Sequence, residues 1–419
     1  MESLRSLFKI GHGPSSSHTM GPGIAAGMFL KLFPDAVSYE ADLFGSLAAT
    51  GKGHLTDEAI RDVFHDRKIE VFWYPDIEKP FHPNAVTFKA LDDHSHELGQ
   101  KTYYSIGGGQ IVDDEYASLA MNNEDNTARN THLLVTPENQ IYPPEVSDMS
   151  KILSFCNREG MQIWELAVHF EGSDIFDYMN EIWTVMKNAV EDGLEAEGVL
   201  PGGLKLARKA GQYYQHAKDL KGSLGEDALA MSFALAVAEQ NAGGGLIVTA
   251  PTCGSAGVLP GMLYFYHKRM DVPLKRILKA LLTAGVIGNV VKTNGSISGA
   301  EVGCQGEVGV ACAMASGAGA QIQGGSIYQI EYAAEMGLEH HLGLTCDPMK
   351  GLVQIPCIER NAMAATRAVC NAIYALLSDG RHKVSFDDVV DVMMVTGHAI
   401  PSLYRETSKG GLATLTFSN

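Results

Sequence analysis

Positive charge is scarce in this chain of 419 residues, as are long apolar runs and cysteine. Lys and Arg number 32 against 49 Asp and Glu, which leaves a formal net charge of -17 at pH 7. A protein this acidic repels the phosphates of nucleic acids and anionic lipids. Neither nucleic acid nor a membrane surface is therefore an expected partner.

Long apolar segments are also missing, because no run of about 18 apolar residues occurs and no transmembrane helix is predicted. The uncharged stretch 308–330 is interrupted by Gly, Ser and Gln, which predicts buried helix and turn. The N-terminal sequence MESLRSLFKIGHGP carries an acid at once and lacks the apolar run and cleavage site of a signal peptide. We expect a cytosolic protein.

Seven cysteines are an odd number in a large chain without a secretion signal, which argues against a disulfide framework. They are expected as thiols, ligands or core residues, and the absence of a CxxC pair argues against a structural zinc site. Cys156 and Cys370 fall within amphipathic helical patterns, and Cys312 lies in the small-residue segment GVACAMASG. We predict that these three are small core residues.

Hydrophobic periodicity divides the chain into two parts. From Ser38 to about Ile111, short alternating runs such as AVSYEADLF and NAVTFKAL indicate a modest mixed sheet, with a helix at DEAIRDVFHD. Long helical periods rich in Gly and Ala follow the segment TPENQIYPPEVSDM. We predict an α+β protein with an N-terminal α/β domain over residues 1–145 and a mostly helical domain over 146–419.

Polar loops in the N-terminal part are suited to a bound anion. The segment GHGPSSSHTMGPG (11–23) offers Ser15, Ser16, Ser17 and His18 between glycine–proline breaks, and a helix N-cap is the alternative interpretation. The segment YYSIGGGQIVDDE (103–115) ends a strand in three glycines, whose backbone amides can approach an oxyanion closely. A simple turn would use the same residues.

The segment GSLAATGKGHLTDEA (45–59) places Lys52 and His54 on a glycine-flanked turn, where side chains face a pocket or solvent. Taken alone, His54 is better interpreted as a surface histidine. The segment GGGLIVTAPTCGSAGVLPG (243–261) has two glycine-rich turns, but it fits neither the Walker spacing nor the dinucleotide fingerprint.

Three further cysteines lie in turn-forming contexts: Cys304 in AEVGCQGEVG, Cys346 in LTCDP and Cys357 in IPCIERN. Four thiolates close a metal site, whereas three leave a coordination position for substrate, as a Lewis-acid catalyst requires. From spacing alone, a metal centre and unligated thiols both remain open.

A series of motifs then carries a resemblance over nearly the whole chain. In order, they are GPSSSHTMGP, GSLAATGKGH, YYSIGGG, SISGAEVGCQGEVGVAC, GLTCDP, IPCIERNA and YRETSKGGLA. With them the chain resembles bacterial iron–sulfur L-serine dehydratases in their single-chain form, in which the α/β part corresponds to a β subunit and the helical part to an α subunit. The resemblance implies that L-serine is converted to pyruvate and ammonia at an oxygen-sensitive 4Fe-4S cluster, and we expect a homo-oligomer, most simply a homodimer.

Roles follow from the resemblance position by position. Cys304, Cys346 and Cys357 are the implied cluster ligands, and they leave the fourth iron open. The serine carboxylate is expected near the donors of the N-terminal loops: Ser15, Ser16, Ser17, His18 and Ser105.

His54 is the first choice for proton transfer, followed by Lys52 and His82. A nearby Lys52 ammonium would disfavour the protonated imidazole and keep His54 neutral. Some relatives end in a cysteine that reaches back into the site, whereas this chain ends in TLTFSN, so we expect no thiolate from the tail.

Two alternatives belong to other classes. A pyridoxal phosphate dehydratase needs a Schiff-base lysine, but no lysine lies in the Ser-x-Lys-x-Arg-Gly context of that family. A non-catalytic amino-acid sensor would bind serine in the α/β region while the helical part oligomerises, and it would leave the three loop cysteines without a purpose.

Overall fold

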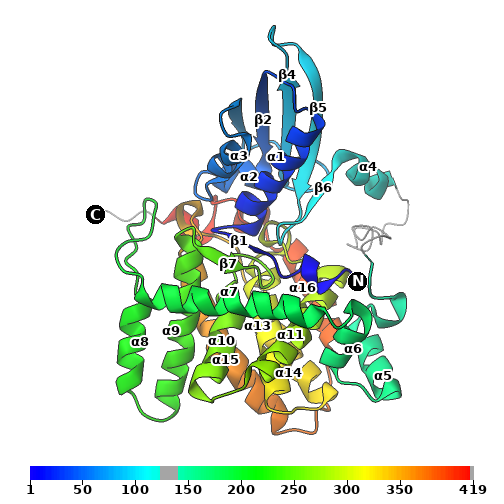
Figure 1. Ribbon diagram of the computed structural model, residues 1–419, viewed down its shortest axis with the longest axis vertical. Coiled ribbons are helices and arrows are strands. Elements are labelled where there is room, and N and C mark those ends of the chain that lie inside the picture. Colours follow the sequence, from blue (N-terminus) through cyan, green and yellow to red (C-terminus); the bar gives the residue numbers. More distant parts are fainter. Residues whose placement is uncertain (123–139, 416–419) are drawn as a thin grey trace.

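The computed structural model describes residues 1–122 and 140–415 and places them in two regions (Figure 1). A five-stranded sheet flanked by helices stands on a body built almost entirely of helices. The predicted α+β fold, with a mixed sheet followed by a helical part, is confirmed. The last residues of the TLTFSN tail (416–419) lie outside the described part of the chain.

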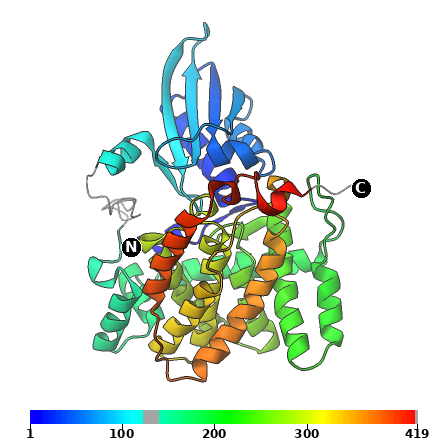
Figure 2. The same cartoon turned by 180° about the vertical axis from the view of Figure 1, so that it is seen from behind.

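The sheet has the strand order β3-β2-β4-β5-β6, and only β2 and β3 are parallel. Helices cover one of its faces, and Figure 2 shows the opposite face without helices over its upper part. Near the helical body, this opposite face carries a smaller buried cluster that includes Phe44, Tyr104 and Ala117 of α4. Buried aromatic rings of Phe29, Tyr39, Phe64 and Phe88 fill the space between helices and strands. The elements are α1 (Gly21–Leu32), β2 (Ser38–Phe44), α2 (Gly45–Thr50), α3 (Thr56–Phe64), β3 (Lys68–Tyr74), β4 (Asn84–Leu91), β5 (Glu97–Ser105), β6 (Ile111–Asp113) and α4 (Asp114–Asn122).

The helical body surrounds α13, whose small residues are buried on nearly all sides. Glycine allows neighbouring helices to approach closely: a Cβ at Gly337 would lie 2.7 Å from Ala313 Cα. The stretch 308–330 is helix and turn, as predicted, and the helical part 308–322 is buried. The turn itself is mostly exposed, because Gln323, Gly324 and Ser326 lie at the surface. The helices are α5 (Met149–Glu159), α6 (Ile163–Glu171), α7 (Ile175–Glu195), α8 (Ala210–Asp219), α9 (Ser223–Ala242), α10 (Val258–Arg269), α11 (Leu274–Asn294), α12 (Gly299–Val302), α13 (Val308–Ile322), α14 (Ile327–Glu339), α15 (Cys357–Leu376) and α16 (Phe386–Ala399).

The first residues of the chain pack against the helical body rather than the sheet. Leu4, Leu7 and Phe8 belong to its hydrophobic core, and β1 (Ile10–His12) pairs antiparallel with β7 (Leu246–Val248). The chain therefore starts in the helical body and then enters the sheet region, which places the serine-rich loop at the junction. A domain boundary near residue 145 stays a prediction.

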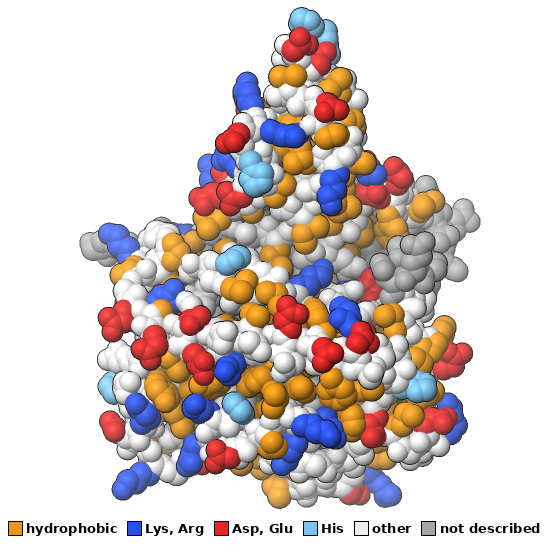
Figure 3. Space-filling model, viewed as in Figure 1, with side chains coloured by type: hydrophobic (Ala, Val, Ile, Leu, Met, Phe, Trp, Pro, Cys, Tyr) orange, Lys and Arg blue, Asp and Glu red, His pale blue; other side chains and the backbone are white. Residues whose placement is uncertain are grey.

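On the face shown in Figure 3, acidic and basic side chains alternate, and no large patch of one sign is visible. Within residues 1–122 and 140–415, no helix has the length and apolar character needed to cross a bilayer.

Close helix packing generates the first prediction. A Cβ at Gly261 in α10 would lie 2.6 Å from the backbone nitrogen of Ala234 in α9. We expect Gly261→Ala to lower the free energy of unfolding by about 1–3 kcal/mol, because neither backbone can move away. Gly27→Ala in α1 is the matched control, since the nearest atom, Val63 Cγ1, is 3.9 Å from the new Cβ. It should be neutral or stabilising by up to about 1 kcal/mol. Urea denaturation of both variants tests this, and equal losses would contradict it.

Candidate active site at the junction of the two regions

The three loop cysteines come together where helices of the body begin. Cys304 lies in the short turn η5 (Cys304–Gly306) before α13, Cys357 is the first residue of α15, and Cys346 lies in the loop after α14. Cys304 and Cys346 are buried and Cys357 is half-buried. Burial is the main cause that raises the pKa of Cys346 and of Cys357, and negative charge on Cys304 raises both pKa values further.

Acidic groups surround these thiols. Glu307 accepts a hydrogen bond from Thr252 Oγ1 at 2.7 Å, and its Oε2 lies 3.8 Å from Cys346 Sγ. Negative charge on Glu307 raises the pKa of Cys346, whereas the Arg360 guanidinium opposes the effect of burial on the pKa of Cys304. Three ionised thiols and a carboxylate would repel one another strongly in this buried place. The site therefore suits a cationic group held by the three sulfurs.

Glycine keeps the space beside the sulfurs open. A Cβ at Gly299 would lie 3.2 Å from Cys346 Sγ and 2.6 Å from Glu307 Oε2. Any side chain at this position would enter the space between the thiol and the carboxyl. The donor set and this cradle both fit a thiolate-ligated metal centre, because soft thiolate ligands favour iron–sulfur clusters and zinc.

A segment near the C-terminus closes the site. Cys346 N donates to Tyr404 O at 2.8 Å, and Glu406 N donates to Cys346 O at 2.6 Å. Glu406 has a left-handed backbone conformation, with φ of 58°, and is only 6% exposed. Its backbone oxygen accepts a hydrogen bond from Ser46 Oγ at 2.6 Å, so one residue links the cysteine loop to the sheet region.

Two histidines from the sheet region face this segment. His18 Nδ1 lies 3.4 Å from Glu406 Oε1, and the rings of His18 and His54 have centroids 4.4 Å apart. Ligand atoms of His18, His54 and Glu406 all lie within 4.8 Å of one another. Both rings are fully buried, and burial lowers the pKa of His54 to about 3. The imidazole of His54 is therefore neutral at pH 7.

Several buried polar atoms nearby have no hydrogen-bond partner among the described residues. They include His54 Nε2, His82 Nε2, Ser105 Oγ, Ser298 Oγ and both amide atoms of Asn84. Asn84 and Ser105 adjoin the paired residues Ala85 and Tyr104 of β4 and β5, which places them on neighbouring strand ends. An unsatisfied buried polar group costs about 1–3 kcal/mol, so a cluster of them indicates a place for a polar ligand.

In the serine-rich loop (residues 15–18), some hydroxyl groups form hydrogen bonds within the loop itself. Ser15 Oγ accepts from His18 N at 3.1 Å and thereby caps the helical turn Ser16–Met20, which is the N-cap alternative considered from the sequence. Ser17 Oγ bonds to His18 Nδ1 at 2.8 Å, and Ser16 Oγ accepts from Cys253 N at 3.5 Å. The loop thus connects both regions and orients the ring of His18.

The surroundings of Lys52 and His54 differ from those that the sequence predicted. Lys52 is exposed, and its Nζ lies 5.6 Å from the centroid of the Trp73 ring, outside the buried cluster. His54 is not a surface histidine, because its turn folds back under the serine-rich loop and its backbone oxygen accepts a hydrogen bond from Thr19 Oγ1 at 2.6 Å. Burial, and not a neighbouring ammonium, is the main cause of the low pKa of His54.

Among the predicted core cysteines, Cys156 and Cys312 are buried as expected, whereas the prediction for Cys370 was wrong. Cys370 is exposed, because it lies on the outer face of α15.

The sequence analysis missed Glu307, Glu406 and Asn84 as residues of the site. Glu307 follows Cys304 by three residues in GCQGEVG, and Glu406 lies within the quoted motif YRETSKGGLA. An acid among glycines at a predicted ligand turn was an available signal for Glu307. For Asn84, only the strand register reveals the neighbourhood of Ser105.

Fold and site together define a class of protein: a two-region α+β protein with a candidate thiolate metal centre in its helical body, faced by histidines and hydroxyls from a mixed sheet. Comparison with known families identifies the particular family. Residues 114–413 match the family model of the serine dehydratase alpha chain, and residues 3–66 and 61–116 match that of the serine dehydratase beta chain. The chain belongs to the serine dehydratase family.

Curated relatives agree over their full length. The chain is 40% identical to an L-serine dehydratase of Streptomyces coelicolor over 98% of both chains. It is 39% identical to L-serine dehydratase 1 of Escherichia coli over 99% of both, and 36% identical to an L-serine dehydratase of Helicobacter pylori over 98% of both.

Proposed function

We propose that this protein is an L-serine dehydratase that converts L-serine to pyruvate and ammonia. The observation that carries the proposal is the convergence of Cys304, Cys346 and Cys357 near Glu406, whose carboxyl faces His18 and the neutral, buried His54. The chain is also similar over its full length to L-serine dehydratases. A homo-oligomeric state and a cytoplasmic location remain predictions.

Cys304, Cys346 and Cys357 are the residues that would hold a 4Fe-4S cluster. When bound, such a cluster supplies a Lewis acid that stabilises the β-hydroxyl of serine as it leaves. Arg360 supports the ligand turns, because its guanidinium donates to Thr345 O next to Cys346 at 2.6 Å. Burial raises the pKa of Glu307 and of Glu406, so a cationic group in the pocket would stabilise their ionised forms.

Residues of the sheet region are suited to bind and orient the amino acid. Ser105 Oγ and Asn84 Nδ2 can donate to the substrate carboxylate, and neither has another partner among the described residues. A Cβ at Gly21 would lie 2.3 Å from Ser105 Oγ, so glycine is required there to leave this hydroxyl free. Glu406 provides an acidic partner for the α-ammonium group on the opposite side, next to His18.

His54 is suited to remove the α-proton. Its Nδ1 is held by Thr50 Oγ1 at 3.1 Å, which fixes the ring, while Nε2 has no described partner and can accept a proton. A bound carboxylate brings negative charge and raises the pKa of His54 from its low resting value toward the working pH. Burial of both histidines also excludes water, which protects the dehydrated intermediate from side reactions.

The ligand assignment predicts that Cys304→Ser, Cys346→Ser and Cys357→Ser each lose the cluster together with activity, because each removes one of three protein anchors. Cys312→Ser is the matched control, since Cys312 is buried but lies within α13 away from the acids. Iron and acid-labile sulfide are measured on anaerobically purified protein. Full iron and full turnover in Cys346→Ser would refute the assignment, and an iron-free wild-type protein would favour the sensor or pyridoxal phosphate alternatives.

The proton-transfer role predicts that His54→Ala lowers kcat by roughly 10² to 10⁴ while iron content stays normal. Exchange of the serine α-proton with deuterated solvent should stop as well, because exchange needs the base and not the loss of the hydroxyl. Lys52→Ala is the control, since this side chain lies over Trp73 and should leave kcat unchanged. Wild-type kcat in His54→Ala would move the search for the base to His82 and His18.

A further inference from the structure

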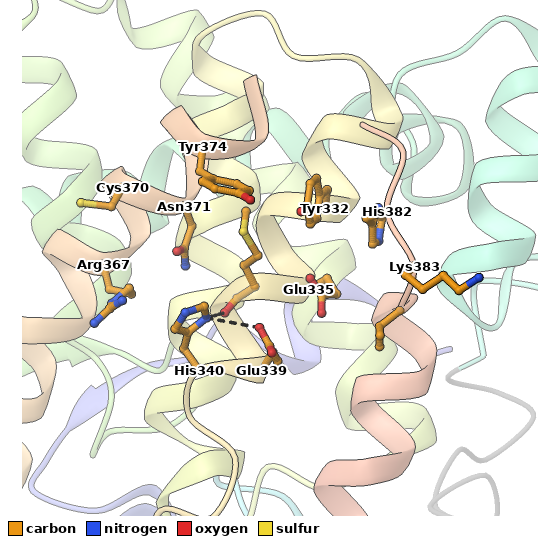
Figure 4. A pocket seen from close by; sticks show the side chains of 12 residues that line it. Tyr332, Glu335, Glu339, His340, Arg367, Cys370, Asn371, Tyr374, His382 and Lys383 are labelled. Carbon is orange, nitrogen blue, oxygen red and sulfur yellow. Dashed lines mark hydrogen bonds and ion pairs between the residues drawn. The ribbon is translucent and has the colours of Figure 1, made fainter. Parts of the chain in front are cut away.

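A cavity opens away from the junction, on the outer side of the helical body. It measures about 510 Å³ and lies between α14 and α15, bordered by residues 382–384 (Figure 4). Arg367 is the α15 residue of its wall nearest to Cys357, and it follows Cys357 by 10 residues, which corresponds to about 15 Å along the helix. The cavity is therefore separate from the candidate active site.

Glu335 is an unpartnered buried acid on the wall of this cavity. It is 4% exposed, its carboxyl points into the cavity in Figure 4, and it forms no hydrogen bond or ion pair with any described residue. Glu331, one turn earlier, is satisfied: it accepts from Phe386 N at 2.8 Å and pairs with His382 Nε2 at 3.1 Å. Burial, together with the nearby Glu339, raises the pKa of Glu335 to about 7. A cationic group bound in the cavity would remove this penalty.

Aromatic and apolar side chains form the walls beside Glu335. Tyr332 stacks on His382 with ring centroids 4.2 Å apart, and Tyr374 meets Tyr332 edge to face at 5.9 Å. Met336 and Val384 complete this wall. Aromatic faces attract cations and apolar side chains alike, so the wall suits a ligand that has both.

Positive charge lies on another part of the lining. Arg367 borders the cavity and forms no hydrogen bond or ion pair with a described residue, and Figure 4 shows it on the opposite side of Asn371 from Glu335. An acid and a guanidinium thus share one cavity without pairing. A ligand that carries both charges can satisfy the two groups together.

We propose that this cavity binds an α-amino acid with an apolar side chain. The ammonium group lies at Glu335, the carboxylate lies toward Arg367, and the side chain packs among Tyr332, Met336 and Tyr374. Such an amino acid has no β-hydroxyl and is not a substrate of the proposed reaction, so this binding site does not depend on the proposed function.

The test is calorimetric titration of L-leucine into the holoenzyme and three variants. We expect wild type to bind one L-leucine per chain at this cavity, and both Glu335→Gln and Arg367→Gln to weaken binding by about tenfold or more, since each removes a charged hydrogen-bond partner. Glu197→Gln, at an exposed acid of the loop after α7, is the matched control and should bind as wild type does. The single-charge probes 3-methylbutylamine and 4-methylpentanoate should each bind at least about tenfold more weakly than L-leucine.

Several outcomes would overturn the proposal. The absence of binding to wild type at about 20 mM L-leucine is one, and equal affinity in wild type and Glu335→Gln is another. If Glu335→Gln changes the sedimentation coefficient but not the affinity for L-leucine, the cavity is a contact surface for a second copy of the chain and not an amino-acid site. Arg367 is exposed, so Arg367→Gln tests the site even if Glu335→Gln fails to fold.

Discussion

Three thiols, two of them buried and one half-buried, lie next to carboxyl groups and impose the constraint on which the rest of the site depends. They cannot all ionise in a low-dielectric pocket unless a cation joins them, because each negative charge raises the pKa of the others. The body directs the starts of α13 and α15 to one point, and the segment around Glu406 binds the backbone of Cys346 from the other side. A structure that concentrates negative charge in this way is suited to a thiolate-ligated metal.

The junction divides the chemistry between two regions. The helical body contributes sulfur ligands and acids, while the sheet region contributes neutral imidazoles and hydroxyls with unused hydrogen-bonding capacity. Hydrogen bonds across the junction hold the two regions together: Ser46 bonds to Glu406, and the serine-rich loop bonds to Cys253. Because the first residues of the chain pack in the helical body, the loop that carries His18 is anchored at both ends.

Much of this could be predicted from the sequence. The long amphipathic period of α7 and the alternation of β2 predicted these elements, because one more deeply buried face leaves a clear periodic pattern. α11 and β4 were also predicted, although both are buried on more than one face. Turn contexts separated Cys304, Cys346 and Cys357 from the helical cysteines. The environment of single side chains was less predictable: the burial of His54 and the exposure of Cys370 depend on tertiary packing, which glycine-flanked turns and helical periods do not encode locally. Glu406 belongs to the site because its backbone nitrogen donates to Cys346 O, and these two residues lie 60 positions apart in the sequence.

The central claim is that three cysteines hold a 4Fe-4S cluster whose remaining iron is available to the substrate. Mössbauer spectroscopy of the anaerobically purified protein, recorded with and without L-serine, tests it most directly. We predict one iron that is distinct from the other three and that alone responds to L-serine, because only that iron lacks a protein ligand. Four equivalent irons that do not respond to L-serine, or a fully active protein without iron, would contradict the claim.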